Sequence, residues 1–138
     1  MSYRKMKEDE RLARLDSIRS DLDGWGNILF AYIFGSFKEY DEAVGFRDID
    51  VAVYLSDDVE DTLALALSIG AELAGKYNIP IDCIPLNDAP LYMRYRIFRD
   101  GEVLFCKDDK LLDDMTEDTV TEALDFMPLR EEAIRELV

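Results

Sequence analysis

Short apolar segments alternate with longer amphipathic ones along this chain, and this alternation limits the folds open to it. The short segments are rich in branched and aromatic side chains, as buried strands are, and comprise residues 28–34, 48–55, 79–86 and 102–106. The longer segments carry apolar side chains at helical spacing and comprise residues 8–22, 59–77 and 89–98. The pattern predicts a small α/β (α+β) domain with helices packed on a mixed β-sheet.

Composition narrows the chemistry that such a domain can perform. The 138 residues include 31 acidic and 16 basic side chains, a formal net charge of −15, and no histidine. The negative charge disfavours direct binding to DNA or RNA. The lack of histidine excludes Ser-His-Asp and Cys-His catalytic pairs and histidine-ligated metals. Catalysis must therefore depend on carboxylates, hydroxyls, basic side chains or a hard metal ion.

Cysteine content and hydropathy indicate the cellular location. Cys83 and Cys106 lie far apart in apolar segments, which favours buried free thiols over a disulfide. No apolar stretch reaches the length of a membrane span, and the charged N-terminus is unlike a signal peptide. We therefore expect a soluble, cytoplasmic protein without a membrane partner.

Two aspartates near the start of the second apolar segment are the most informative residues. Asp48 and Asp50 are two positions apart on a strand, so their side chains face the same side of the sheet. Carboxylates ~4 Å apart repel by ~4 kcal/mol at an effective dielectric constant of ~20, so solvent, a shared proton or a cation must offset the repulsion. Oxygen ligands select Mg²⁺ or a similar hard ion. The pair alone is also compatible with two solvated side chains at a sheet edge.

Two further features favour a cation site. Asp82 lies in the middle of the next apolar segment, where a buried aspartate would need a partner. The first strand ends abruptly at Gly35-Ser36; glycine allows close backbone approach, and main-chain amides at a helix start can bind phosphate. We predict that the three aspartates converge on one metal site.

The order of these features resembles the nucleotidyltransferase superfamily that includes DNA polymerase β. A strand, Gly35-Ser36, a loop, Asp48-Ile-Asp50 and a lone strand aspartate, Asp82, follow one another in this chain. The short chain and the segments 81–90 and 91–105 are similar to the minimal nucleotidyltransferases (MNT) of that superfamily. The resemblance spans about residues 10–109 and implies a fold like the palm of polymerase β.

The resemblance also implies roles for individual residues. Asp48, Asp50 and Asp82 would be the catalytic residues and would hold two Mg²⁺ ions, with Asp82 helping to remove the proton of the acceptor hydroxyl. The nucleotide, with ATP as donor, would be bound by Gly35, Ser36 and Arg47. Further along, Arg94, Arg96 and Arg99 either contact the triphosphate or pair with the acidic surface.

The loop between Gly-Ser and Asp-x-Asp departs from the family pattern, whereas the carboxylates are intact. Residues 37–47 make this loop one residue longer than usual. Tyr40 stands where a glycine is expected, and Gly45 follows it. Arg47 replaces a frequent serine.

Three functions are compatible with the resemblance. The first is that of antitoxin in a HEPN/MNT toxin–antitoxin pair, in which the family silences a HEPN ribonuclease by adenylylating one of its tyrosines. A chain of 138 residues leaves no second domain for a small acceptor, and an acidic surface suits a basic partner. The second is transfer to a small molecule such as an aminoglycoside, with a dimer partner completing the pocket. The third is binding of the partner without catalysis.

We divide the chain at residue 106. Residues 1–106 form the expected nucleotidyltransferase domain. Residues 107–138 hold 11 acidic and 4 basic side chains, a net charge of −7, among apolar residues at helical spacing. They predict amphipathic helices broken near Pro128. We expect this acidic extension to dock a protein partner in a homo- or hetero-oligomer; the alternative is a helix that covers its own sheet.

Overall fold

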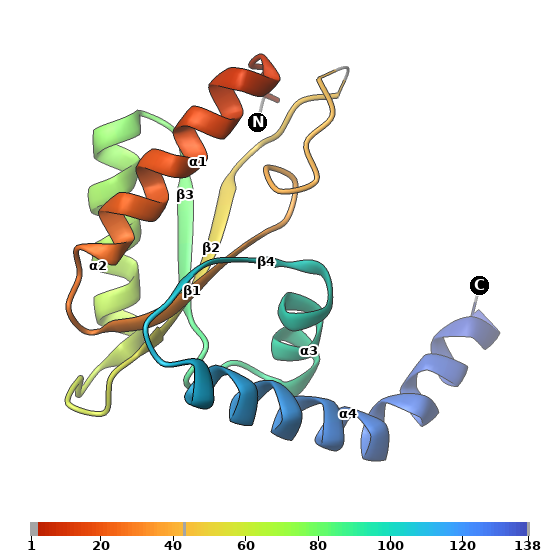
Figure 1. Cartoon of the computed structure of the whole chain (residues 1–138). Helices are drawn as coiled ribbons and strands as arrows, with labels where there is room; N and C mark the ends of the chain where they lie inside the picture. Colours follow the sequence, from red (N-terminus) through yellow and green to blue (C-terminus); the bar gives the residue numbers. More distant parts are fainter. Residues whose placement is uncertain (1–2, 43, 138) are drawn as a thin grey trace.

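A computed structural model of the chain shows one four-stranded sheet between two pairs of helices (Figure 1). Its backbone is described for residues 3–42 and 44–137, and its side chains for the same residues up to 126. The helices are α1 (Glu8–Asp23), α2 (Thr62–Tyr77), α3 (Leu91–Asp100) and α4 (Asp109–Leu137). The strands are β1 (Ile28–Phe34), β2 (Ile49–Leu55), β3 (Ile81–Pro85) and β4 (Glu102–Cys106). The expected α+β fold with a mixed sheet is confirmed.

The strand order of the sheet is β3-β2-β1-β4. β1 runs antiparallel to β2 and to β4, whereas β2 and β3 are parallel. β3 is therefore an edge strand. The register pairs Asp50 with Phe34 of β1 and with Asp82 of β3. This pairing brings the end of β1 and the starts of β2 and β3 together.

Apolar side chains pack on both faces of the sheet, and β2 contributes to both. Ala52 and Tyr54 belong to the cluster on the side of α3 and α4. The residues between them face α1 and α2, where they join the larger cluster; they are Ile49, Val51, Val53 and Leu55. Burying one such branched side chain stabilises the fold by about 1.5–3 kcal/mol. The strand alternation predicted for this segment is confirmed.

Small residues and local hydrogen bonds set the positions of the helices. Gly70 lets α2 approach β3, since a Cβ there would lie 3.1 Å from the carbonyl oxygen of Ile81. The side chain of Asp61 caps α2 by accepting a hydrogen bond from the amide of Ala64 at 3.0 Å. The side chain of Asn87 accepts a hydrogen bond from the main-chain N–H of Leu55 and donates one to its C=O. It thereby ties the end of β3 to the end of β2.

The last helix differs from expectation. We expected a break near Pro128, but the backbone forms one helix over Asp109–Leu137. A proline inside a helix removes one main-chain hydrogen bond, and the neighbouring turns here remain helical. Side chains from residue 127 onward lie outside the described residues. In the first half of α4, Leu111, Leu112 and Met115 pack on the cluster of the α3 face.

The structure also shows the hydropathy of the described helices and the state of the two cysteines. Across residues 3–42 and 44–137, no helix is both long and apolar enough to cross a membrane. Cys83 is a buried free thiol and Cys106 a half-buried one. Burial raises the pKa of the Cys83 thiol to about 12, so this thiol is unreactive.

Candidate active site

Asp48, Asp50 and Asp82 lie at the start of the parallel pair of strands. Asp48 directly precedes β2, and Asp50 is the second residue of that strand. Asp50 and Asp82 are direct neighbours in the parallel register, so their side chains point to the same face of the sheet. This is the face that carries Ala52 and α3, away from the larger apolar cluster.

The environment of Asp50 disfavours its charged form. Burial, followed by the charges of Asp82 and Asp48, raises the pKa of Asp50 from its ordinary 3.8 to about 6, and Arg47 opposes the rise. Asp82, which we expected to be buried, is exposed because β3 is an edge strand. A half-buried carboxylate beside two others marks a place where a positive charge would be favourable.

Gly35 and Ser36 form the wall of the site opposite the carboxylates. Gly35 has a φ of +78°, and a Cβ there would lie 2.2 Å from Oδ2 of Asp50. Glycine is thus required both by backbone conformation and by the carboxylate that lies against it. Residues 36–39 form a single turn closed by a hydrogen bond from Glu39 N–H to Gly35 C=O at 3.1 Å. The exposed Ser36 accepts a hydrogen bond from Arg47 N–H at 3.4 Å, which joins the two ends of the loop.

The three carboxylates are the type of ligand that a hard cation prefers, but their positions do not form a ready-made binding cluster. Among the residues whose side chains are described, no three acidic or cysteine side chains already form a metal-binding cluster. The donors are all carboxylate oxygens, which favour Mg²⁺, and they lie close enough to act on the pKa of Asp50. Mutual repulsion keeps such groups apart when no cation lies between them.

Two hollows adjoin the site, separated by Phe34 and Met93. The first lies beside the carboxylates, between β3 and α2, and is lined by residues that include Asp50, Asp82, Leu67 and Gly70. The second lies between the end of β1 and α3, and is lined by residues that include Gly35, Glu39, Tyr92 and Arg96. An extended ligand could therefore contact both the carboxylates and α3.

The structure gives different surroundings to the three arginines of α3, for which the sequence allowed the same two roles. Arg94 pairs with Glu122 at 3.5 Å, and Arg99 pairs with Asp100 at 2.9 Å. Arg96 lines the hollow beside Gly35. Sequence reasoning missed the residues that support the loop, chiefly Arg11 and Tyr40; the unexpected tyrosine at position 40 was the one available signal.

Comparison with known proteins yields one family and a set of similar folds. The family model described as Polymerase beta, Nucleotidyltransferase matches residues 16–110. A tri-AMPylated Shewanella oneidensis HEPN toxin in complex with MNT antitoxin is similar with a TM-score of 0.69 and 18% identity, covering 92% of this chain and 98% of the matched chain. The toxin–antitoxin complex MntA–HepT gives 0.67 and 17%, covering 91% and 97%. A toxin–antitoxin structure with AMP-PNP gives 0.65 and 17%, covering 95% and 98%. A comparison with curated proteins found no match.

Proposed function

This chain belongs to the polymerase β nucleotidyltransferase family, and on that premise we propose that it transfers AMP from ATP to a hydroxyl group of a partner protein. The pairing of Asp50 with Asp82 across β2 and β3, with Gly35 against the Asp50 carboxylate, carries this proposal. This arrangement places two neighbouring carboxylates beside the turn at residues 36–39, and such a pair suits metal-assisted phosphate transfer.

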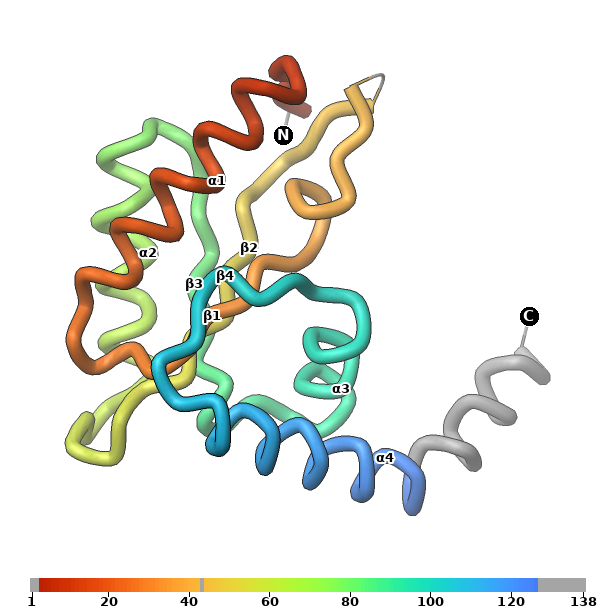
Figure 2. The backbone as a smooth tube through the Cα atoms, viewed as in Figure 1, coloured from red at the N-terminus to blue at the C-terminus, as the bar shows by residue number. Residues whose placement is uncertain are grey.

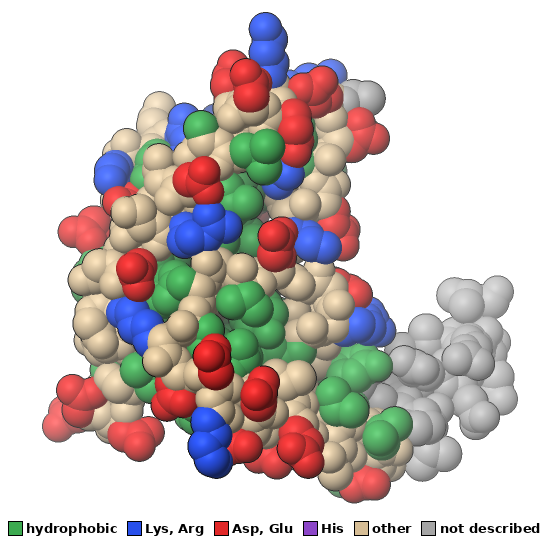
Figure 3. All heavy atoms as spheres, viewed as in Figure 1, with side chains coloured by type: hydrophobic (Ala, Val, Ile, Leu, Met, Phe, Trp, Pro, Cys, Tyr) green, Lys and Arg blue, Asp and Glu red, His purple; other side chains and the backbone are tan. Residues whose placement is uncertain are grey.

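The acceptor that we propose is a tyrosine of a HEPN-type ribonuclease toxin, which the modification would silence, so that the chain acts as its antitoxin. Structures with a similar fold include an MNT antitoxin with a tri-AMPylated HEPN toxin and a toxin–antitoxin structure with AMP-PNP. The net charge of −15 favours association with a basic, RNA-cleaving protein, and acidic side chains are spread over the face in Figure 3. The free thiols are in keeping with a cytoplasmic location.

In the proposed mechanism, each part of the site has a task. The three aspartates would hold Mg²⁺, which when bound neutralises the triphosphate and lowers the pKa of the acceptor hydroxyl. Ser36 and the main-chain amides of residues 36–38 in the turn bind the β- and γ-phosphates. Asp82, exposed at the sheet edge, accepts the proton of the tyrosine hydroxyl. The tyrosine oxygen then bonds to the α-phosphorus, the bond to the bridging oxygen breaks, and pyrophosphate leaves with the electron pair.

Intact-mass spectrometry tests this function directly. The chain is incubated with ATP, MgCl₂ and the HEPN-type protein of the neighbouring reading frame. We expect the mass of that protein to rise by whole additions of AMP with wild type and with Asp57→Asn, which removes an exposed aspartate in the turn after β2. Asp50→Asn should give no addition. An unchanged mass in the wild-type reaction would contradict transfer to this partner.

A second candidate function, neutralisation by binding alone, is favoured by one observation. Arg47 lies exposed beside the carboxylates and opposes the rise in the pKa of Asp50, so this chain itself supplies part of the positive charge that a bound cation would bring. In this case wild type and Asp50→Asn would inhibit the ribonuclease equally well. Its mass would stay unchanged with either protein.

A further inference from the structure

The segment before α1 holds the loop that connects Gly35 to Asp48. This loop leaves the end of β1 and extends to the N-terminal segment before it returns to β2 (Figure 2). Arg4 N–H donates to Phe46 C=O at 2.6 Å, and Phe46 N–H donates to Arg4 C=O at 2.9 Å. Because Phe46 lies two residues before Asp48, this bridge restrains the backbone that leads into the carboxylates.

Gly45 makes the close approach of the two segments possible. Its φ is +86°, and a Cβ there would lie 2.3 Å from the carbonyl oxygen of Arg4. A side chain at this position would push the N-terminal segment away. The second glycine of the loop is thus required by the bridge to Arg4.

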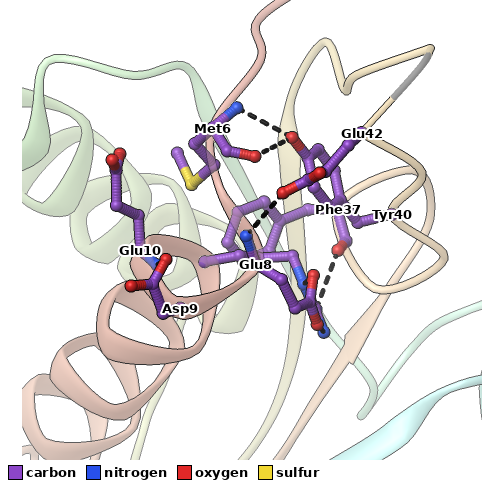
Figure 4. Close-up of polar contacts among 8 residues, drawn as sticks. Met6, Glu8, Asp9, Glu10, Phe37, Tyr40 and Glu42 are labelled. Carbon is purple, nitrogen blue, oxygen red and sulfur yellow. Dashed lines mark hydrogen bonds and ion pairs between the residues drawn. The ribbon is translucent and has the colours of Figure 1, made fainter.

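Tyr40 provides a second connection between the loop and the N-terminal segment (Figure 4). Its hydroxyl accepts a hydrogen bond from Met6 N–H at 2.7 Å and donates one to the Met6 carbonyl oxygen. Its ring packs edge-on against Phe46, which in turn packs edge-on against Phe37 with ring centroids 4.8 Å apart. Both phenylalanines are fully buried. The glycine expected at position 40 would make none of these contacts.

The first turns of α1 provide a third connection. Arg11 donates a hydrogen bond to the Phe37 carbonyl oxygen at 3.2 Å, and its guanidinium lies 5.8 Å and 5.9 Å from the ring centroids of Phe37 and Tyr40. Glu8 holds that guanidinium with two hydrogen bonds of 2.6 Å and 2.9 Å. The amide of Glu8 also donates to the carboxylate of Glu42 at 2.9 Å (Figure 4).

We propose that residues 4–11, here called the N-terminal brace, position the loop between Gly35 and Asp48, with Tyr40 and Arg11 as positioning residues. Among the described residues of this loop, the brace forms hydrogen bonds with Phe37, Tyr40, Glu42 and Phe46. The family match begins at residue 16, so the brace lies outside the part that carries the shared chemistry. The inference rests on the proposed function in that the loop binds ATP.

Tyr40→Phe tests the brace because it removes the hydroxyl and keeps the ring. Tyr77→Phe is the matched control, since Tyr77 donates a similar hydrogen bond to Asp21, between α2 and α1. The measurements are amide hydrogen exchange of residues 36–47, the affinity for ATP with MgCl₂ by titration calorimetry, and the urea midpoint. With Tyr40→Phe we expect loop exchange and the Kd for ATP to rise about three- to tenfold. The urea midpoint should shift no more than in Tyr77→Phe.

Gly45→Ala provides an independent second variant. It disturbs the brace through the Arg4 carbonyl and should accelerate loop exchange more than Tyr40→Phe does. Loop exchange that matches the Tyr77→Phe control in both variants would overturn the brace, as would unchanged ATP affinity in both. If wild type itself fails to bind ATP, the proposed function is wrong, while the exchange rates still decide whether the brace holds the loop.

Discussion

Replacing Asp50 with asparagine should stabilise the metal-free protein. Burial and the charges of Asp82 and Asp48 raise the pKa of Asp50 from 3.8 to about 6. Because the pKa of the folded state exceeds that of the unfolded state, ionisation of Asp50 costs folding free energy as the pH rises from about 4 to about 6. At about 1.4 kcal/mol for each unit of pKa, the cost above pH ~6 is ~2–3 kcal/mol. Asparagine has nearly the same shape and no charge, so it should recover this free energy.

Urea unfolding in EDTA at about pH 7.5 and about pH 5 measures the effect. The gain of ~2–3 kcal/mol at the higher pH should fall to about half at the lower one, where folded wild type already carries a proton on Asp50. Asp57→Asn is the control for the general loss of negative charge and should change stability by less than about 0.5 kcal/mol. The electrostatic reasoning is refuted if Asp50→Asn is no more stable than Asp57→Asn, or if its gain is the same at both pH values.

The structure supports four further predictions. Millimolar MgCl₂ should raise the urea midpoint of wild type and not of Asp50→Asn; equal shifts would contradict a carboxylate metal site. Gly35→Ala should destabilise the fold by ~1–3 kcal/mol in thermal melts and abolish transfer, because its Cβ would meet Asp50 Oδ2 at 2.2 Å; wild-type stability would refute this. Leu112→Ala, on the half-buried side of α4, should cost ~1–2 kcal/mol in urea unfolding. Leu124→Ala, 70% exposed, should change stability by less than ~0.5 kcal/mol and weaken binding to the proposed partner in calorimetry; unchanged affinity would argue against docking there.

The sheet could be predicted from the sequence because its strands carry their signal locally. In β2, alternate side chains fill two different apolar clusters, and the period of two is visible in the sequence itself. The placement of Asp50 and Asp82 on one face follows from the same period together with a parallel register. The exposure of Asp82 was missed, because it depends on which strand forms the edge, a property of the whole sheet.

The spacing of apolar residues in the C-terminal segment only partly determines the role of that segment. Its helical spacing was readable, yet the same amphipathic pattern serves a helix that covers its own sheet and one that docks a partner. Leu111, Leu112 and Met115 pack on the sheet cluster, whereas Leu124 and Phe126, further along α4, are exposed. Docking therefore stays a prediction, and it concerns the distal part of α4.

The loop between Gly35 and Asp48 shows why a sequence motif predicts the positions of the carboxylates better than the conformation of the loop beside them. Strand geometry positions Asp50 and Asp82, so the spacing of the aspartates carries the information. Several hydrogen bonds that hold the loop use main-chain groups of Arg4, Met6 and Phe46, and a hydrogen bond to a main-chain group leaves no residue type to recognise in the sequence. In the sequence, the extra residue and the tyrosine in place of glycine therefore look as if they would disturb the conformation of the loop. In the folded chain, Tyr40 compensates by bonding a segment outside the family match, so this loop can keep a fixed position without the family's own glycine.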